Sequence, residues 1–329
     1  MVDLKTIYMG LELKNPIIVG SCGLTGKLDS IKQLAEAGAS AVVLKSLFEE
    51  QIMMEVNKNM DGYNPVHGHT EMYDYQKYFE KQHLLENYLQ LIKDAKQAID
   101  IPIIASINCM SSADWTGFAK DIEHAGADAL ELNIFLLPSN PKMEGKDNEN
   151  VYFDIIKKVT AEVSMPISIK ISHYFDNLAN TLQRFSKTNI EGMVLFNRFY
   201  NTDIDIEKEE LIAGNIFSTA DDMSNSLRWI GIMSDLVDCD LCATTGIHNG
   251  TDVIKFLLAG ASSVQMVSSI YNNSPKIIEK SLDEISDWMQ KHNYESIEKF
   301  KGKLSKTSDM NNAFYERVQF MKYSSTKKK

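Results

Sequence analysis

The chain has 329 residues, 44% of them hydrophobic and 24% charged, which is typical of a globular protein with a sizeable core. A formal charge of −11 argues against nucleic acid or an anionic membrane surface as the main partner. The sequence shows no apolar leader and no uncharged apolar run approaching about 18 residues, so we expect no membrane contact and a cytoplasmic protein.

One pair of the four cysteines, Cys239 and Cys242, has the C-x-x-C spacing of many metal sites. Neither a second pair nor a histidine lies at the spacing along the chain that a zinc site requires. We therefore expect reduced thiols and no metal.

The predicted elements repeat one pattern in chain order: a short strand of branched residues, a polar turn and an amphipathic helix. Strands are predicted at residues 15–20, 40–46, 101–108, 127–134, 166–172, 192–198, 240–246 and 262–269. Helices are predicted at 29–38, 112–126, 151–163, 176–187, 220–236, 251–261 and 274–291. Alternating strands and helices form a parallel sheet, and eight such units within about 270 residues match a TIM (β/α)₈ barrel.

An open, doubly wound sheet is the alternative arrangement of alternating strands and helices. It commonly has fewer strands and carries a glycine fingerprint after the first one. The segment GSCGLTG at 20–26 contains glycines, but not at that spacing. We therefore predict a single barrel domain over residues 1–329.

One segment interrupts the pattern, because residues 47–83 separate the second strand from its helix. A connection of this length is usually functional or disordered, and it contains three of the chain's seven histidines. We predict a lid over the barrel mouth, with a flap packed by its own aromatic residues as the alternative.

Polar residues gather at the predicted carboxyl ends of the strands, where barrels of this kind carry their catalytic groups. They are Lys45, Ser46, Ser106, Asn108, Asn133, Lys170, Ser172, Asn197, Arg198, Thr244, Thr245, Gly246, Ser268 and Ser269. Any one of them could simply cap the turn that follows its strand. Two lysines, three asparagines and several hydroxyls at one rim nevertheless favour a polar site.

Lys45 and Lys170 alternate with core residues, so both are predicted to point into the top of the barrel, close to each other. A buried lysine needs a partner, and Glu131 could supply an ion pair with only a structural role. Alternatively, the lysines stabilise negative charge on a ligand, or Lys170 forms a Schiff base as in barrel aldolases.

The turns after the seventh and eighth strands suit a phosphate, which this fold commonly holds there through backbone N–H groups. TTGIHNGTD at 244–252 offers hydroxyls and glycines, and SSIYNNSP at 268–275 offers two further hydroxyls. Together with the rim lysines, these turns predict a phosphorylated cofactor or substrate.

Several motifs can be compared with known families: NPIIVGSCG, AGASAVVLKS, ELN at the fourth strand, PISIKISHYFD, TTGIHNGTDVIKFLLAGASSVQMVSS and, at 294–304, YESIEKFKGKL. Together they resemble the dihydroorotate dehydrogenase family, class 1, from the first strand nearly to the C-terminus. The resemblance implies a barrel that binds FMN at its rim. It also implies either a homodimer, which is the association we expect, or a complex with an iron–sulfur subunit.

The resemblance also implies roles for individual residues. Those implied to bind the cofactor are Gly20, Ser21, Lys45, Ser46, Asn133, Lys170, Asn197, Thr245, Gly246 and Ser268. Lys170 matches the lysine beside flavin N1 and O2, where reduced flavin accumulates negative charge and a fixed cation favours reduction.

The chain departs from the family at the catalytic base. The family's loop after the fourth strand carries a cysteine or serine that removes the substrate's ring proton, whereas Leu136 and Leu137 occupy that neighbourhood here. The candidate catalytic groups are Lys45, Lys170, Ser139 and His173, with Cys109, His67 and His69 as further candidates for the base.

Two further motifs differ from the family's. GYNPVHGH (62–69) stands in place of the substrate-binding Asn-x-x-Gly-Leu-Pro-Asn, and NIFSTADDMSNS (215–226) stands where glycines are expected after the sixth strand. In the phosphate turns, Thr245-Gly246 and Val267-Ser268 replace Gly-Gly and Gly-Thr. Val267 adds a branched side chain where the backbone normally approaches phosphate, so we expect weaker FMN binding or different phosphate contacts.

The resemblance thus implies an FMN-dependent oxidoreductase acting on CH–CH bonds, with dihydroorotate or a similar small molecule as substrate, as in pyrimidine biosynthesis. In the family's reaction a base takes a proton and a hydride passes to the flavin. One alternative keeps the flavin but takes a different substrate, in a pocket that the lid and the two leucines make more apolar. A second alternative is a Schiff-base lyase using Lys170, and a third is a barrel without catalysis.

Overall fold

The computed structural model describes residues 2–48, 70–108, 112–199, 201–305 and 315, with the backbone alone for residues 48, 70–81 and 112–114. The candidates His67, His69 and Cys109 lie outside the described residues.

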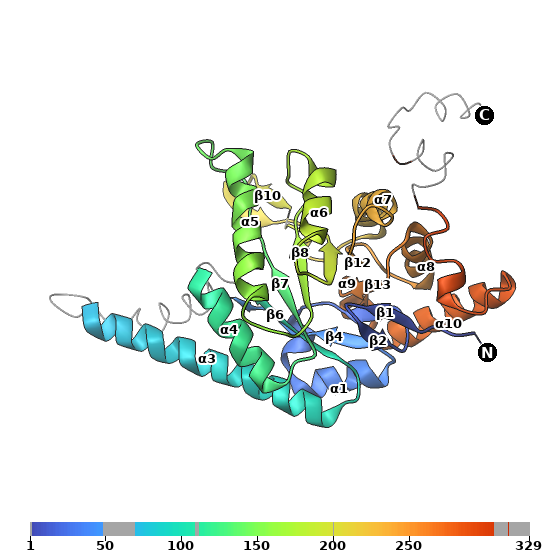
Figure 1. The fold of residues 1–329 in the computed structure, drawn as a ribbon, viewed down its shortest axis with the longest axis horizontal. Helices are drawn as coiled ribbons and strands as arrows, with labels where there is room; N and C mark the ends of the chain where they lie inside the picture. Colours follow the sequence, from blue (N-terminus) through green and yellow to red (C-terminus); the bar gives the residue numbers. More distant parts are fainter. Residues whose placement is uncertain (1, 49–69, 109–111, 200, 306–314, 316–329) are drawn as a thin grey trace.

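Eight parallel strands close into a barrel, as the sequence predicts (Figure 1). They are β3 (Ile17–Val19), β4 (Ala41–Val43), β6 (Ile103–Asn108), β7 (Ala129–Asn133), β8 (Ile167–Ile171), β9 (Gly192–Leu195), β12 (Asp240–Thr244) and β13 (Ser263–Met266). Each strand pairs with the next, and the pairings of β13 with β3 and of β4 with β6 complete the ring. All eight lie within the predicted strand segments, so their carboxyl ends meet at one rim.

Helices surround the barrel. They are α1 (Leu28–Glu36), α3 (Thr70–Ala98), α4 (Ser112–Ala125), α5 (Gly145–Thr160), α6 (Leu178–Ser186), α7 (Met223–Met233), α8 (Gly250–Ala259), α9 (Ser268–Asn273) and α10 (Lys276–Lys291), with short 3₁₀ turns at Gly23–Gly26, Ala220–Asp222 and Ile297–Lys299. Asparagine side chains begin two of them, because Asn177 accepts from the N–H of Asn180 and Asn249 from that of Asp252.

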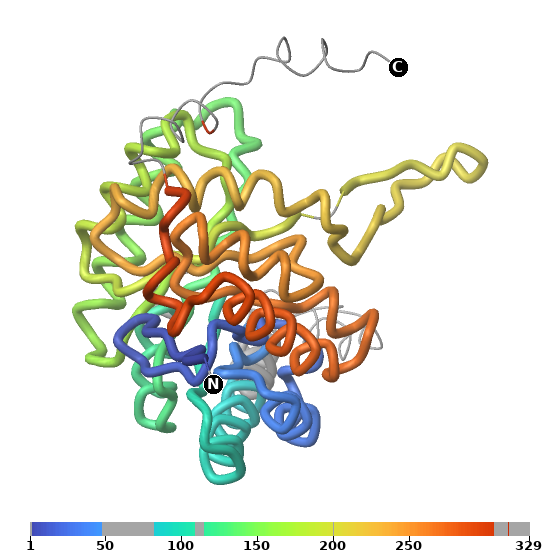
Figure 2. Tube along the Cα trace, turned by 90° about the vertical axis from the view of Figure 1, so that its right-hand side faces the viewer, coloured from blue at the N-terminus to red at the C-terminus, as the bar shows by residue number. Residues whose placement is uncertain are grey.

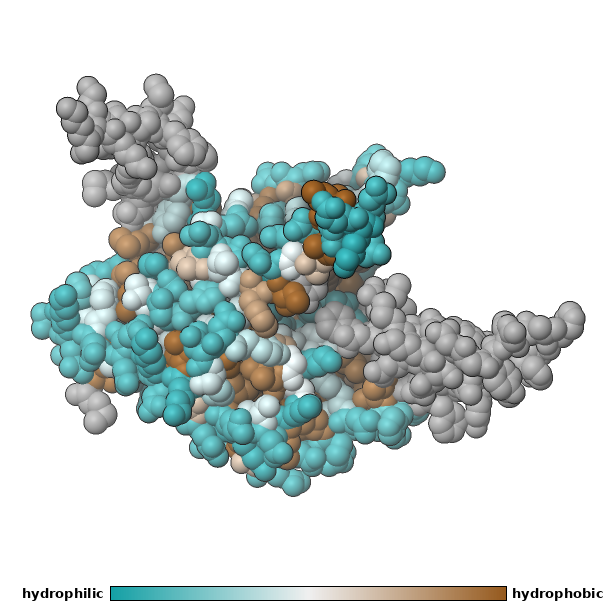
Figure 3. All heavy atoms as spheres, turned by 180° about the vertical axis from the view of Figure 1, so that it is seen from behind, coloured by the Kyte–Doolittle hydropathy of each residue, from teal (hydrophilic) through white to brown (hydrophobic). Residues whose placement is uncertain are grey.

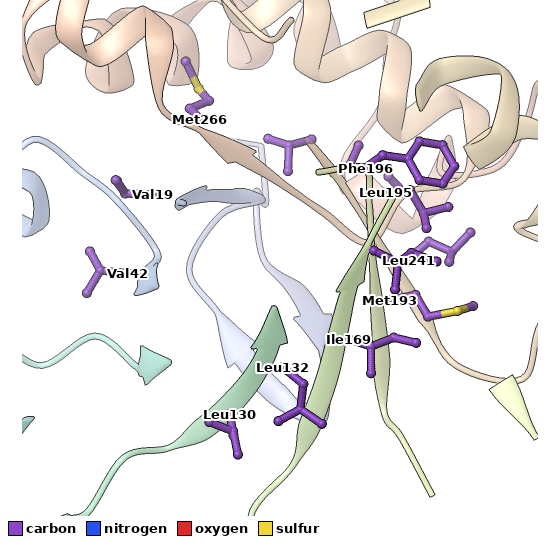
Figure 4. Close-up of a cluster of buried hydrophobic side chains, with 14 of the residues drawn as sticks. Val19, Val42, Leu130, Leu132, Ile169, Met193, Leu195, Phe196, Leu241 and Met266 are labelled. Atoms are coloured by element: carbon purple, nitrogen blue, oxygen red, sulfur yellow. The ribbon is translucent and has the colours of Figure 1, made fainter. Parts of the chain in front are cut away.

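The barrel strands are apolar on both faces, as expected for a parallel sheet covered by helices. Outward residues such as Leu132, Ile169 and Leu195 are fully buried against the helical layer (Figure 4). Inward residues such as Ile18 and Val194 form a separate cluster inside the barrel.

A hairpin near the N-terminus, which the sequence analysis did not predict, packs on this inner cluster. It consists of β1 (Thr6–Tyr8) and β2 (Leu11–Leu13), and Tyr8, Met9 and Leu13 are all buried against the inward strand residues. The Met9 N–H donates to Asp240 at 2.9 Å, at the amino end of β12. The hairpin therefore closes the amino end of the barrel and leaves the carboxyl end as the accessible one.

The predicted insertion at 47–83 is partly secondary structure. Its first residues form a short strand, β5 (Leu47–Phe48), which pairs with β6, and α3 begins at Thr70 within the segment. The helix after the second strand is therefore longer than the sequence analysis predicts. The lid itself stays a prediction, because residues 49–69 lie outside the described part of the chain.

A second unpredicted hairpin, formed by β10 (Thr202–Asp205) and β11 (Glu210–Ala213), projects from the barrel after β9 (Figure 2). Its exposed apolar side chains include Ile204, Ile206 and Leu211, with exposed fractions of 58%, 79% and 77%. On the face shown in Figure 3, apolar residues lie among a mostly hydrophilic surface.

The N-terminal hairpin provides a test of barrel closure. Met9→Ala should lower the free energy of unfolding by about 3 kcal/mol, because it leaves a cavity in the inner cluster. Ile7→Ala changes an exposed residue of the same hairpin and should cost less than about 0.5 kcal/mol. Urea unfolding of both variants measures the difference, and equal costs would contradict the closing role.

Candidate functional site

A cavity of about 780 Å³ opens at the carboxyl ends of the barrel strands. This volume is within the range of roughly 300–1,000 Å³ that is typical of cofactor and substrate pockets. Among the described residues it is lined by Ser21, Cys22, Gly23, Lys45, Ser46, Asn133, Phe135, Lys170, Phe196, Asn197, Arg198, Phe199, Ile216, Phe217, Ser218, Thr244, Thr245, Gly246, Ile247, Gln265, Val267, Ser268 and Tyr271. The predicted rim site thus lies in a cavity that also has an aromatic wall.

A continuous row of hydrogen bonds joins the predicted residues across the cavity floor. The hydroxyls of Ser21 and Ser46 are 3.0 Å apart, and Asn133 donates to the Ser46 hydroxyl at 3.4 Å. Asn197 in turn donates to the Asn133 side-chain carbonyl at 2.8 Å and to the Lys170 backbone carbonyl at 3.3 Å. Because each side chain is held by the next, the strand ends present fixed donors and acceptors to a ligand.

Ser106 and a tyrosine outside the barrel extend this row. The Ser46 and Ser106 hydroxyls are 2.7 Å apart. The Tyr88 phenol on α3 donates to the Ser106 carbonyl at 3.0 Å and accepts from its N–H at 2.8 Å, and burial raises the pKa of this phenol. Tyr88 therefore fixes the end of β6 from the helical side, a role that the sequence analysis missed.

Lys170 lies inside the barrel and forms an ion pair. Its ammonium is 3.9 Å from Glu131, which is 1% exposed, and 3.2 Å from the Gln265 side-chain carbonyl. Gln265 also donates to Glu131 at 2.5 Å. The ion pair between Lys170 and Glu131 is therefore present, as one alternative in the sequence analysis has it. The same ammonium also lines the cavity, so the ion pair does not exclude contact with a ligand.

Gln265 is a site residue that the sequence analysis missed. It comes from β13 and reaches Glu131 on β7, a strand that is not its neighbour in the barrel, so the contact crosses the interior. The sequence SVQM of β13 could have indicated this role, because Ser263 and Gln265 share one face of a fully buried strand, where a polar side chain needs a polar partner.

Lys45 lies at the same cavity in a different environment. Its side chain is exposed, whereas the neighbouring Leu44 and Ser46 are buried. The side chain lines the cavity beside the first-strand turn, and its exposure places the ammonium of Lys45 at the rim rather than deep in the barrel. A cation at the rim is better hydrated than one inside, so Lys45 is suited to a charge at the cavity mouth.

Two of the predicted glycines lie at points of close approach. A Cβ on Gly20 would lie 2.9 Å from a methyl carbon of Val267, so the branched side chain of Val267 packs against the end of the first barrel strand. Gly246 has φ +77°, and a Cβ there would lie 2.3 Å from the Met223 backbone nitrogen. Gly246 therefore requires glycine, whereas a side chain at Gly20 would have to displace the side chain of Val267.

The backbone of Thr245 is strained. Its φ is +76°, a left-handed value that is unfavourable for a β-branched residue. Its hydroxyl donates to the Phe196 carbonyl at 3.2 Å and thus fixes the turn after β12 to the end of β9.

Two of the predicted catalytic candidates lie away from the lining. Ser139 is exposed, and its N–H donates to the Leu137 carbonyl at 2.8 Å. His173 is also exposed, and its ring lies 4.4 Å from that of Tyr174 and 5.8 Å from that of Phe196. Partial burial of the imidazole lowers the pKa of His173. Neither residue is among those that line the cavity.

The predicted leucine wall is also wrong. Leu136 packs against the core between the barrel and its helices, and Leu137 is 56% exposed. Phe135 lines the cavity instead, and its ring is stacked 4.0 Å from that of Phe199. The apolar wall on this side is therefore aromatic.

Cys22 is a further cavity residue that the sequence analysis did not propose. It is a free thiol at the end of the first barrel strand and is partly buried beside the Tyr271 phenol. Partial burial and the neighbouring thiol raise the pKa of Tyr271. By contrast, burial raises the pKa of Cys239 and Cys242 to about 12, and neither of them lines the cavity.

Positively charged side chains line the cavity. Lys45, Lys170 and Arg198 line it, and no Asp or Glu is among the described residues of the lining, although the whole chain carries a net charge of −11. Two of these cations also lie near carboxylates outside the lining, Lys170 near Glu131 and Arg198 near Asp222. Cations that line a cavity favour anionic ligands. Within the described part of the chain, no cluster of three or more His, Cys, Asp or Glu side chains could share a metal ion, and no helix has the length and apolarity to cross a membrane.

The fold and the site define a (β/α)₈ barrel protein with a cation-lined cavity at the carboxyl ends of its strands. The sequence model of the family described as dihydroorotate dehydrogenase matches residues 67–289, more than half of the chain. The chain therefore belongs to the dihydroorotate dehydrogenase family, a family of oxidoreductases.

Curated relatives match over nearly their whole length. The catalytic subunit of dihydroorotate dehydrogenase B (NAD(+)) from Methanocaldococcus jannaschii is 28% identical, over 88% of this chain and 94% of the relative. The corresponding subunit from Thermoplasma volcanium is 26% identical, over 92% and 98%. Dihydroorotate dehydrogenase A (fumarate) from Lactococcus lactis is 25% identical, over 92% and 99%.

The turn after β12 provides a second test. Gly246→Ala should lower the free energy of unfolding by at least about 3 kcal/mol, because left-handed strain is joined by a clash with the Met223 backbone. Gly126→Ala is the matched control: its φ of +94° is also left-handed, but a Cβ there meets nothing within 4 Å, so about 1 kcal/mol is expected. Chemical denaturation measures both, and similar costs would refute the close approach.

The Lys170–Glu131 pair provides a third test. Lys170→Met should cost about 3 kcal/mol of stability, because it leaves the buried Glu131 carboxylate without its cation. In a Glu131→Gln background the same change should cost about 1 kcal/mol or less, since no buried carboxylate is then left unpaired. A double-mutant cycle by urea unfolding gives the coupling, and additive costs would show that the pair does not interact.

Proposed function

We propose that this protein is an FMN-dependent oxidoreductase that acts on a CH–CH bond of a small anionic substrate, with dihydroorotate as the first candidate. The observation that carries the proposal is the cavity at the barrel rim, which combines three cations and two linked asparagines with a lining free of described carboxylates. Family membership and the names of the relatives support the same activity.

The residues present fit FMN. Gly246 lines the cavity at a turn that a side chain would not fit, and Gly20 lies directly before the lining residue Ser21, packed against Val267. Ser21, Ser46, Asn133 and Asn197 supply polar groups for a flavin ring, and Lys170 supplies a cation. When bound, FMN supplies the acceptor or donor of a hydride.

Lys170 and its partners set the electrostatics of the site. Glu131 and Gln265 hold the ammonium in place from below, so its position does not depend on the ligand. A fixed cation stabilises negative charge that develops on a bound group without reorganisation during the reaction. Asn133 and Asn197 hold each other in one orientation and can bind and orient a substrate amide or carbonyl.

One observation at the end of the fourth barrel strand favours a second substrate class. Phe135 lies in the cavity just after the fourth barrel strand, where the family's loop carries its base, and Phe199 stacks on it. A phenyl ring cannot take a proton, but it offers an apolar face to a planar substrate. A flavin enzyme with a planar substrate more apolar than dihydroorotate is therefore the second candidate.

Purified protein distinguishes these functions. The protein should be yellow with a flavin spectrum, and dihydroorotate added without oxygen should bleach it if the first candidate is right. Yellow protein that dihydroorotate leaves unbleached supports the second candidate. Colourless protein that borohydride traps on a carbonyl substrate would show the Schiff-base lyase instead, and colourless protein without trapping would favour a barrel without catalysis.

The homodimer and the cytoplasmic location remain predictions. Exposed apolar patches on a protein surface commonly mark sites of association. The projecting β10–β11 hairpin carries such residues in Ile204, Ile206 and Leu211, which supports the expectation of self-association.

A further inference from the structure

Three chain segments meet at one end of the cavity and are linked through serine side chains. Ser218 lies between the projecting hairpin and α7, Gly246 follows β12, and Ser268 begins α9. Ser218 is only 8% exposed, yet it lines the cavity together with Gly246 and Ser268. The sequence analysis assigned nothing to Ser218.

The hydrogen bonds between these segments run in one direction. The Gly246 N–H donates to the Ser218 hydroxyl at 3.3 Å, and the Ser218 hydroxyl donates to that of Ser268 at 3.0 Å. The Ser268 oxygen also accepts from the Ser218 N–H at 3.0 Å. A serine hydroxyl accepts two hydrogen bonds and donates one. Since both acceptor positions of Ser268 are in use, its remaining capacity is that of a donor.

A chain of donors that ends at a cavity wall is suited to an anion. Each hydrogen bond in such a chain polarises the next, which strengthens the last donor. Ser218 also occupies the Gly246 N–H, so this backbone donor reaches a ligand only through the two hydroxyls. The Ser268 hydroxyl thus offers a ligand the hydrogen-bond donor that the backbone N–H of an open glycine turn would offer directly.

Arg198 adds a cation beside the same segment. One of its terminal nitrogens donates to the Ile216 carbonyl at 2.9 Å, two residues before Ser218, and its Nε lies 3.7 Å from Asp222. A guanidinium has five N–H donors, and these two contacts leave others for the cavity that Arg198 lines. Arg198 is thus held in position by its own loop while it can still bind a ligand oxygen.

We propose that Arg198, Ser218 and Ser268 form a side-chain binding site for the phosphate of the bound cofactor; this inference rests on the proposed function. Its location agrees with the fold, because (β/α)₈ barrels commonly seat phosphate at the loops after the seventh and eighth strands. Arg198 contributes charge, Ser268 the terminal donor, and Ser218 positions Ser268 and links it to Gly246.

The experiment compares FMN with riboflavin, which lacks the phosphate. The full chain is freed of flavin, and quenching of flavin fluorescence gives the dissociation constant of each. The wild-type chain should bind FMN at least about a hundredfold more tightly than riboflavin. Arg198→Gln and Ser218→Ala should weaken FMN binding by about tenfold each and leave riboflavin binding unchanged.

Two control variants match the changes. Lys208→Gln removes one positive charge from the projecting hairpin, outside the cavity lining, and Ser186→Ala removes the hydroxyl of a buried serine on α6. Both should bind FMN and riboflavin as the wild-type chain does. Retained riboflavin binding by the Arg198 and Ser218 variants also shows that these variants are folded.

The outcomes separate this inference from the proposed function. If the wild-type chain binds neither flavin, the proposed function and the phosphate site both fail. If it binds FMN and riboflavin equally, or if the Arg198 and Ser218 variants lose both flavins to the same extent, the flavin function stands and the side-chain phosphate site is overturned.

Discussion

The contact between Lys170, Glu131 and Gln265 inside the closed barrel determines much of this structure. Below it, the interior is apolar and closed by the hairpin that carries Tyr8 and Met9; above it, the interior is polar and opens into the cavity. A charged pair at this depth is stable only because each partner is bound by other groups. Gln265 performs that role by contacting both ions across the barrel.

The cavity above this layer differs from a glycine-lined phosphate cradle in a consistent way. Thr245 takes a left-handed conformation in the turn after β12, and Val267 turns its branches toward Gly20. Ser218 then brings a hydroxyl to the Gly246 N–H. At all three positions side chains, rather than open backbone, lie at the turns around this end of the cavity.

The aromatic side of the cavity bears on the substrate. Phe135 and Phe199 stack at the ends of β7 and β9, while Ser139 and His173 lie outside the lining. The partly buried Cys22 and the Tyr271 phenol lie together at the end of the first barrel strand. The polar floor is therefore joined to an apolar wall, and the Cys22 thiol and the Tyr271 phenol both line the cavity.

The sequence by itself determined the eight strands, their order and the polar rim, because branched residues at alternating positions and turn residues between them are local properties. It also placed Lys45, Ser46, Asn133, Lys170 and Asn197 at one rim, since parallel strands bring their carboxyl ends together. Only the tertiary structure decided that Lys45 is exposed, that Phe135 rather than Leu136 faces the cavity, and that Ser218 meets Ser268. These features depend on the paths of loops and on contacts between residues far apart in the chain, and the spacing of residue types in the sequence carries no record of them.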